Sequence, residues 1–442
     1  MKSKAITVVL TLIAIFAPLL IIPETKIYDY NILKFGFLMF AGAVLLLLLL
    51  INYKKLKFDI KDILILIFLG LAIISTLFSS DIKKSIFGEV SRYEGLIMLI
   101  TYISIYFTSK KFFYYDKTKV FFNIIFYVSL IIGILGILQR HISYWPLYPI
   151  FNKFIGSTFG NSNFFGSYIS LILPGAMCAF ILYNNKKGFG LSILMFFNMI
   201  ASGTRSAWVA FALIGLIGII YLIQQKNKIY FKRALILLII FIVIFIYLYN
   251  GMDIISTISK NLDIFTSKNT NMSQFAGNKF KQLREDLEIL KKEGITNNMG
   301  SGRIQIWSMV LELIYKQPLL GCGPDNLKDG LINNCTKSLL EYVKNAKVFV
   351  DKAHNEYMQT AATIGVPALI IYLGFLALIV LPRMKLIFKD KTSFIIFLII
   401  ISYLAQAFFN ISTIGVAPLF WMILGLTDNE EFILKIKEEI ND

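Results

Sequence analysis

Three side chains in polar segments of this chain could act on a phosphorylated substrate: Arg205, Arg303 and His354. Arginine is scarce here, with seven residues against 37 lysines. A guanidinium is a planar fork that binds phosphate oxygens with two hydrogen bonds, whereas a lysine ammonium acts as a point charge. The choice of arginine at these positions therefore favours phosphate recognition.

The surroundings of the two arginines leave an ordinary alternative for each. Arg205 lies in Ser202–Gly203–Thr204–Arg205–Ser206 between two apolar runs, where a guanidinium could also snorkel to the bilayer edge. Arg303 follows Gly300–Ser301–Gly302 and precedes an amphipathic stretch. Glycine permits close backbone approach and a helix start favours anions, but a plain loop cation fits the same pattern.

His354 occurs in Lys352–Ala353–His354–Asn355–Glu356–Tyr357, just before an apolar run. Histidine is the side chain that changes charge near neutral pH without special tuning. It is therefore a natural general base for an attacking hydroxyl. The alternative is an interfacial histidine whose ring is satisfied by a backbone carbonyl.

Weaker candidates lie in other polar segments. Arg92, in Ser91–Arg92–Tyr93–Glu94–Gly95, could bind substrate or pair with Glu89 or Glu94. Asn161 and Asn163 open an apolar run, where their amides could bond a sugar or diphosphate or cap a helix.

Long apolar runs must position these residues. The chain has 442 residues, a mean hydropathy of +0.70, 57% hydrophobic and 16% charged residues. These values exclude a plain soluble enzyme and a disordered chain. A membrane-crossing helix needs about 20 mostly apolar residues. The sequence predicts an all-α polytopic membrane protein with about twelve transmembrane helices, at roughly 5–22, 33–52, 60–78, 95–108, 120–138, 164–183, 189–203, 206–224, 232–250, 356–381, 392–409 and 412–427.

Loop charge predicts the orientation of these helices. With the N-terminus in the cytoplasm, 18 Lys and Arg residues fall in inner loops and 7 in the short outer loops. Cytoplasmic retention of Lys and Arg sets topology, so both termini are expected inside, with a cytoplasmic tail at 428–442. The predicted organisation is helices one to nine over 1–250, a large extracytoplasmic loop over 251–355, and helices ten to twelve over 356–427.

The large loop is expected to be partly helical. Ile304, Trp307, Leu311 and Ile314 fall at helical spacing and predict one amphipathic helix, which ends at Gln317–Pro318. The range Gln274–Glu293 predicts a second, highly charged helix that includes Arg284.

Other chemistries find little support. The net charge of +17 comes from an excess of Lys and Arg residues, which lie between apolar runs and would face membrane lipid rather than nucleic acid. No P-loop, nucleophile elbow or zinc spacing is present, and no compact acidic motif requires a metal. Cys322 and Cys335 share the large loop and could pair or remain free thiols.

Taken together, the chain resembles the O-antigen ligase family, which includes O-antigen polymerase-like and protein O-oligosaccharyltransferase-like members. The motifs that carry the resemblance are Ser202–Gly203–Thr204–Arg205, Arg303 with Trp307, Pro318–Leu319–Leu320–Gly321–Cys322–Gly323, and Ala353–His354–Asn355–Glu356–Tyr357 followed by Gly365. The Gly160–Asn161–Ser162–Asn163 and Ser91–Arg92–Tyr93–Glu94–Gly95 segments fit as well. The likeness runs from about residue 90 to 380, and Thr363 stands where many members have an acidic residue.

The resemblance implies a GT-C-like membrane glycosyltransferase that needs neither metal nor cofactor. Such an enzyme moves a glycan from an undecaprenyl-diphosphate carrier to a hydroxyl of a glycan, lipid or protein, at the extracytoplasmic face of the plasma (inner) membrane. By resemblance the catalytic residues are Arg205, Arg303 and His354. The same resemblance implies that Arg92, Asn161, Asn163, Trp307, Asn355 and Tyr357 bind substrate.

The residues favour the same reaction, because preorganised guanidinium groups stabilise the charge that grows on a departing diphosphate. Ligase, polymerase and protein O-oligosaccharyltransferase activities share this donor chemistry. A flippase or transporter for the same lipids is an alternative of another class, but it would need a polar path through spans that carry almost no charge. A structural scaffold would leave the arginines without a shared role.

Overall fold

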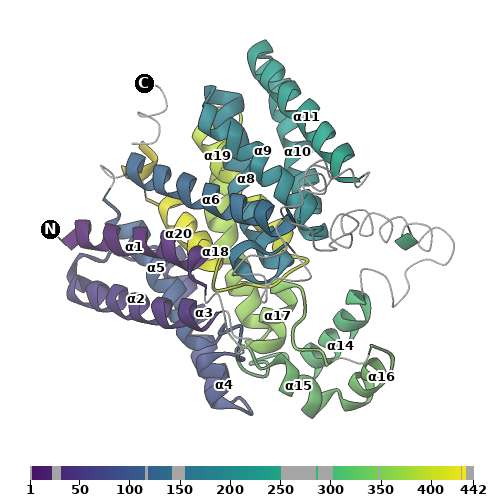
Figure 1. The fold of residues 1–442 in the computed structure, drawn as a ribbon. Helices are drawn as coiled ribbons and strands as arrows, with labels where there is room; N and C mark the ends of the chain where they lie inside the picture. Colours follow the sequence, from purple (N-terminus) through teal and green to yellow (C-terminus); the bar gives the residue numbers. More distant parts are fainter. Residues whose placement is uncertain are drawn as a thin grey trace.

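The computed structural model describes residues 2–21, 31–114, 118–141, 155–249, 285–286, 302–346, 349–429 and 431–434. Within these ranges the fold is all-helical, without strands (Figure 1). The first part contains α1 (Lys2–Leu19), α2 (Ile32–Ile51), η1 (Tyr53–Lys55), α3 (Ile60–Leu77), α4 (Ile82–Phe87), α5 (Leu96–Phe112), α6 (Thr118–His141), η3 (Ser157–Phe159), α8 (Ser162–Tyr183), α9 (Lys186–Ala201), α10 (Arg205–Gln225) and α11 (Lys228–Tyr249). The second part contains α14 (Arg303–Lys316), α15 (Leu327–Asn334), α16 (Thr336–Ala346), α17 (Glu356–Thr363), α18 (Val366–Met384), α19 (Lys391–Ala407) and α20 (Ala417–Thr427).

Seven of the described helices are long and apolar enough to cross a membrane: α2, α3, α6, α8, α10, α11 and α18. Three shorter apolar helices correspond to α1, α19 and α20. The chain is therefore an integral membrane protein, because lipid admits only helices or closed barrels as spanning elements. A helix occupies each predicted range, but the total of twelve spans and the GT-C-like architecture stay predictions.

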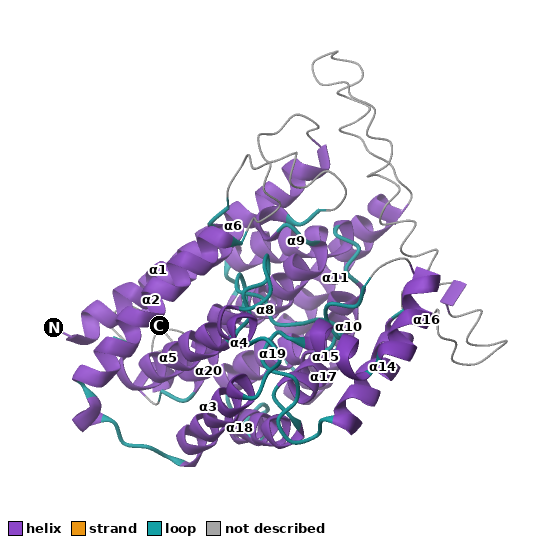
Figure 2. Ribbon diagram, turned by 90° about the horizontal axis from the view of Figure 1, so that it is seen from below, coloured by secondary structure: helices purple, strands orange, loops and turns teal. Residues whose placement is uncertain are grey.

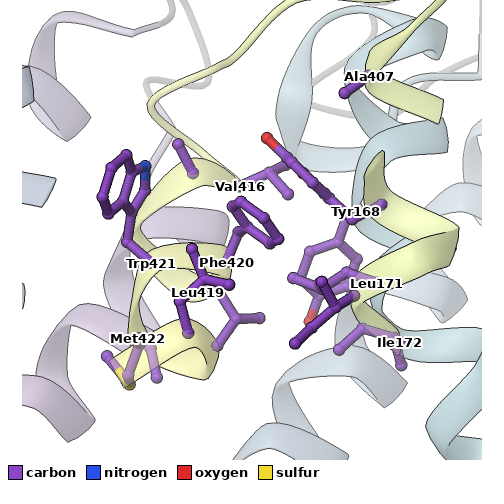
Figure 3. Close-up of a cluster of buried hydrophobic side chains, with 14 of the residues drawn as sticks. Tyr168, Leu171, Ile172, Ala407, Val416, Leu419, Phe420, Trp421 and Met422 are labelled. Atoms are coloured by element: carbon purple, nitrogen blue, oxygen red, sulfur yellow. The ribbon is translucent and has the colours of Figure 1, made fainter. Parts of the chain in front are cut away.

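The helices of the two parts pack as one bundle. α20 packs against α5, α19 against α8 and α10, and α18 against α3. Tyr168 of α8 and Phe420 of α20 lie in the same buried cluster (Figure 3). The Tyr403 and Phe420 rings stack with their centroids 3.9 Å apart. Apolar side chains from both ends of the sequence thus form a shared core.

The predicted span at 356–381 is wrong as a single helix. It breaks at Gly365, whose φ of +108° is unfavourable for other residues. A Cβ there would also lie 2.1 Å from the Leu319 carbonyl oxygen. The turn after α14 docks at this break, where Val366 N donates to Pro318 O (2.8 Å) and Cys322 N donates to Ala362 O (3.0 Å). α17 is therefore separated from the spanning helix α18.

α14, α15, α16 and α17 form a layer beside the bundle, here called the cap layer (Figures 1 and 2). The predicted amphipathic helix is present as α14 and ends at Lys316, just before Gln317–Pro318. Its predicted apolar face is confirmed in part, because Trp307 and Ile314 pack partly buried against the core of the layer. Ile306, Met309, Val310 and Leu313 are buried, whereas Leu311 is 58% exposed. α15 and α16 pack against this helix and decide which side becomes the core of the layer.

The two cysteines of the cap layer resolve an open alternative. Cys322 and Cys335 are both buried and both free thiols.

The predicted helix at Gln274–Glu293 lies outside the described residues, apart from Glu285 and Asp286.

At the C-terminal end of α5, six charged side chains form a group of ion pairs, here called the lysine–aspartate cluster. Lys110 Nζ lies 2.7 Å from Asp59 Oδ2, 2.7 Å from Asp62 Oδ1 and 2.6 Å from Asp428 Oδ2. Lys61 and Lys111 complete the cluster through ion pairs with Asp428 and Asp62. These contacts join the start of α3 to the ends of α5 and α20.

A buried lysine lies in the first turn of α2, one of the helices long enough to cross a membrane. Lys34 of α2 is fully buried, and its ammonium donates to Thr158 O (2.8 Å) in η3. This bond ties η3, just before the Asn161–Asn163 segment, to α2.

Candidate active site

His354 is held at the junction between the cap layer and the bundle. Its backbone has a φ of +50°, which is uncommon for a residue other than glycine. Trp307 Nε1 donates to Ala353 O (2.9 Å), and Ala353 N donates to Gln359 Oε1 (2.8 Å). The residue before His354 is thus anchored on both sides of its peptide unit, by α14 and by α17.

The imidazole of His354 is poised as a neutral base. Its Nδ1 is buried without a hydrogen-bond partner in the described part of the chain. Burial, followed by the charges of Lys352 and Arg303, lowers the pKa of His354 to about 3. A ring with so low a pKa stays unprotonated at neutral pH, but it is a weak base as long as its pKa stays this low. An approaching anion would raise this pKa and strengthen the base.

Arg303 begins α14 immediately after Gly302, which has a φ of +78°. Burial, and then the charge of Arg205, lowers the pKa of Arg303 to about 10. Among the described residues no carboxylate forms an ion pair with it. A sheltered guanidinium without a counter-ion favours the arrival of an anion.

Arg205 begins α10 and lies close enough to Arg303 for the two charges to repel. Its Nη1 forms an ion pair of 2.7 Å with Asp286 Oδ2. Thr204 Oγ1, just before Arg205, donates to Ser162 O (2.8 Å) in the first turn of α8. The starts of α8 and α10 therefore adjoin, and helix starts carry a partial positive charge.

Aromatic and amide contacts connect these helix starts to α14. The Trp307 ring lies 5.7 Å from the ring of Phe408 and 6.2 Å from that of Phe409, measured between centroids. Asn410 Nδ2 donates to Asn163 O (3.0 Å). The end of α19 thus links α14 to the start of α8. The charge of Arg205 acts on Arg303 and that of Arg303 acts on His354, so the three predicted residues lie near one another.

The predicted partner of Arg92 is wrong. Arg92 is 6% exposed, and its Nη2 pairs with Asp325 Oδ1 at 2.7 Å, not with Glu89 or Glu94. Its Nη1 donates to Asp351 O (2.6 Å) and lies 3.2 Å from Asp351 Oδ2. These contacts fix the chain three residues before His354. The geometry favours a positioning role, and a contact of Arg92 with substrate stays a prediction.

Three predicted binding residues have structural contacts. Asn161 Oδ1 accepts from Asn163 N (2.8 Å) and caps α8, and Asn355 Oδ1 accepts from Tyr357 N and Met358 N (both 3.0 Å) and caps α17. Tyr357 OH donates to Leu404 O (2.8 Å). Asn161 therefore does cap its helix, as one of the two interpretations of this segment has it. The substrate-binding roles of Asn161, Asn163, Trp307, Asn355 and Tyr357 stay predictions.

Lys352, Asp351 and Gln359 are site residues that sequence reasoning left without a role. Lys352 stands two residues before His354, so proximity to the candidate base was the available signal. In the part of the chain that the structure describes, no three or more His, Cys, Asp or Glu side chains group as metal ligands do. What converges is two guanidinium groups, an ammonium and a neutral imidazole, a set suited to binding an anion and removing a proton.

Comparison with known proteins identifies this part of the chain. Residues 190–373 match the family described as O-antigen ligase. The matched range contains Arg205, Arg303 and His354 and extends from α9 into α18. No curated protein matches the chain. The family predicted from the motifs is confirmed over residues 190–373, which match the O-antigen ligase family, and the match supports an O-antigen ligase-like function in polysaccharide biosynthesis for this integral membrane protein.

Proposed function

We propose that the protein transfers a glycan from undecaprenyl diphosphate to a hydroxyl of a lipid or glycan acceptor, at the extracytoplasmic face of the plasma membrane. The observation that carries the proposal is the neutral His354 imidazole beside two sheltered guanidinium groups, of which Arg303 lacks a described counter-ion. A base and an unneutralised cationic site are the two requirements of this reaction.

The roles follow from where charge develops. As the bond between the sugar and the diphosphate oxygen breaks, its electron pair moves to the phosphate oxygen, where Arg205 and Arg303 stabilise the added charge. His354 accepts the proton of the acceptor hydroxyl as that oxygen bonds to the sugar carbon. Attack opposite the leaving diphosphate inverts the configuration at that carbon.

The positive-inside rule supports the orientation. The lysine–aspartate cluster and the loops rich in Lys and Arg face the cytoplasm in this proposal, and both termini lie on the same side. The cap layer then faces outward, where a lipid-anchored donor presents its glycan. Anchoring in the bilayer confines the donor and so supplies proximity.

The test uses the purified protein in liposomes with undecaprenyl-diphosphate glycan and, separately, a lipid A–core acceptor, a second lipid-linked glycan or a hydroxyl-bearing peptide. We expect transfer to a sugar hydroxyl with inversion, seen by NMR of the product. His354→Ala should lower turnover by about 10²–10⁴-fold. Lys337→Gln, at an exposed lysine of α16, is the matched control and should retain turnover.

Three outcomes would overturn the proposal. Lipid-linked glycan crossing the bilayer without being consumed would indicate a flippase. Transfer only to the peptide would indicate a protein O-oligosaccharyltransferase. Full turnover by His354→Ala would remove the assigned base.

A further inference from the structure

Lys352 is a sheltered cation with incomplete pairing. Its side chain is 19% exposed. Its Nζ lies 3.7 Å from Asp351 Oδ2, within ion-pair range but too far for a hydrogen bond. That carboxylate is also 3.2 Å from Arg92 Nη1, so it serves two cations. The described pairing of the Lys352 ammonium with Asp351 is therefore long and weak, although the ammonium carries three donors.

The ammonium lies within the candidate active site. Its Nζ is 5.8 Å from the centroid of the Phe164 ring, in the first turn of α8. That turn adjoins Arg205 through the bond from Thr204 to Ser162. The charge of Lys352 also lowers the pKa of His354 more than that of Arg303 does. Lys352 therefore lies among the groups that face the proposed diphosphate.

Burial makes this position costly without an anion. Desolvation lowers the pKa of Lys352, aided by the charge of Arg92 and opposed by Asp351 and Asp325. An ammonium in such surroundings gains when phosphate oxygens supply the missing acceptors. A second phosphate would also explain why the site holds a third cation beside two guanidinium groups.

We propose that Lys352 is a third cationic ligand of the lipid diphosphate, and that the Asp351 carboxylate is its counter-ion before the donor arrives. The inference rests on the proposed function and extends it to the phosphate subsite. Lys352 keeps its protons throughout, because the acceptor proton passes to His354 and the electron pair of the broken bond remains on the diphosphate. Its effect is electrostatic and should depend on the number of phosphates.

The test compares wild-type protein with Lys352→Gln, Lys352→Arg and the control Lys337→Gln. The probes are farnesyl diphosphate and farnesyl monophosphate, whose binding is measured directly by calorimetry and as inhibition of transfer. We expect Lys352→Gln to weaken diphosphate binding about 10- to 100-fold and monophosphate binding much less. Lys352→Arg should restore most of the diphosphate affinity, because the charge returns.

Diphosphate binding by Lys352→Gln at the wild-type affinity would overturn the inference, as would an equal loss for both probes. A thermal unfolding midpoint unchanged from wild type would show that the variant is folded. The binding measurement also separates this inference from the proposed function. Absence of transfer by the wild type would refute the function, whereas Lys352-dependent diphosphate binding would still support the phosphate subsite.

Discussion

Lys110 and Arg303 are both sheltered cations of one protein, yet their surroundings are opposite. Lys110 is surrounded by Asp59, Asp62 and Asp428, each within 2.7 Å of its ammonium. Arg303 has no carboxylate partner among the described residues, and its closest charged influence is the repulsion of Arg205. The Lys110 end of α5 is separated from its other end, which follows Arg92 closely in the chain, by the helix length of about 25 Å.

The difference indicates what each region is for. A buried charge with complete pairing holds helices together, and removing one partner is strongly destabilising. Buried charges without complete pairing persist where a ligand supplies the missing partner. We therefore interpret the lysine–aspartate cluster as a structural clamp, and the proposed function places an anion in the cationic site near His354.

The largest expected effect separates the two regions through stability. Lys110→Met should lower the free energy of unfolding by about 3–5 kcal/mol, because three carboxylates lose a shared cation. Thermal unfolding in detergent measures the loss. Lys54→Met, at an exposed lysine near the same end, is the control and should be nearly neutral. A folded Lys110→Met protein with reduced transfer would contradict the clamp.

Arg303→Ala should instead reduce turnover with little effect on stability. Turnover should fall by about 10²–10³-fold, because a donor to the developing charge is lost. The free energy of unfolding should stay close to that of the wild type, because Arg303 forms no ion pair among the described residues that the substitution would remove. Lys316→Ala, which removes an exposed pair with Glu312 from the same helix, serves as control. A large loss of stability without loss of turnover would show that Arg303 has a structural role, like that proposed for Lys110.

Trp307→Phe should have a smaller effect on the placement of His354. The substitution retains the aromatic ring but removes the bond from Nε1 to Ala353 O, worth about 1 kcal/mol. Transfer should fall by roughly five-fold, measured as kcat at saturating donor. Tyr315→Phe, at an exposed aromatic of α14, should leave kcat unchanged. Equal kcat values for the two variants would show that this bond does not position the base.

The smallest effect is expected in the pH profile. The usual pKa of histidine is 6.5, but in this site it falls to about 3, so His354 keeps its basic form as pH decreases. kcat/KM should change less than about two-fold from this group between pH 7.5 and 5.5. Lys352→Gln removes a nearby positive charge, so any acidic limb should move to higher pH. An acidic limb near pH 6.5 in the wild type would contradict the sheltered environment.

The sequence predicted most of the helices but not every boundary. Apolar runs located the spans, because their lengths and compositions match a bilayer. The break at Gly365 escaped hydropathy, because the flanking residues are apolar and the break depends on Leu319 approaching from a distant segment. The buried face of α14 differed in part, since Leu311 is exposed whereas Trp307 and Ile314 contact the core that α15 and α16 complete.

In the candidate site, the sequence predicted the residues of interest but not their interaction partners. Motifs predicted Arg205, Arg303 and His354 as site residues, because their types alone suit the chemistry. The partner of Arg92 could not be predicted, because Asp351 is 259 residues away and the nearby Glu89 and Glu94 were equally plausible counter-ions. The sequence did not distinguish Lys352 from the other lysines, of which the chain has 37 in all, because its role depends on its neighbours in the fold.

By itself, the sequence determined that this chain forms membrane-spanning helices, since a backbone in lipid must satisfy its hydrogen bonds within each segment. It also predicted which side chains suit phosphate and proton chemistry. Only the tertiary structure decided which charges are paired and which lack a carboxylate partner among the described residues. Burial and ion pairing depend on side chains that meet across the fold, and their distances are not encoded in local spacing.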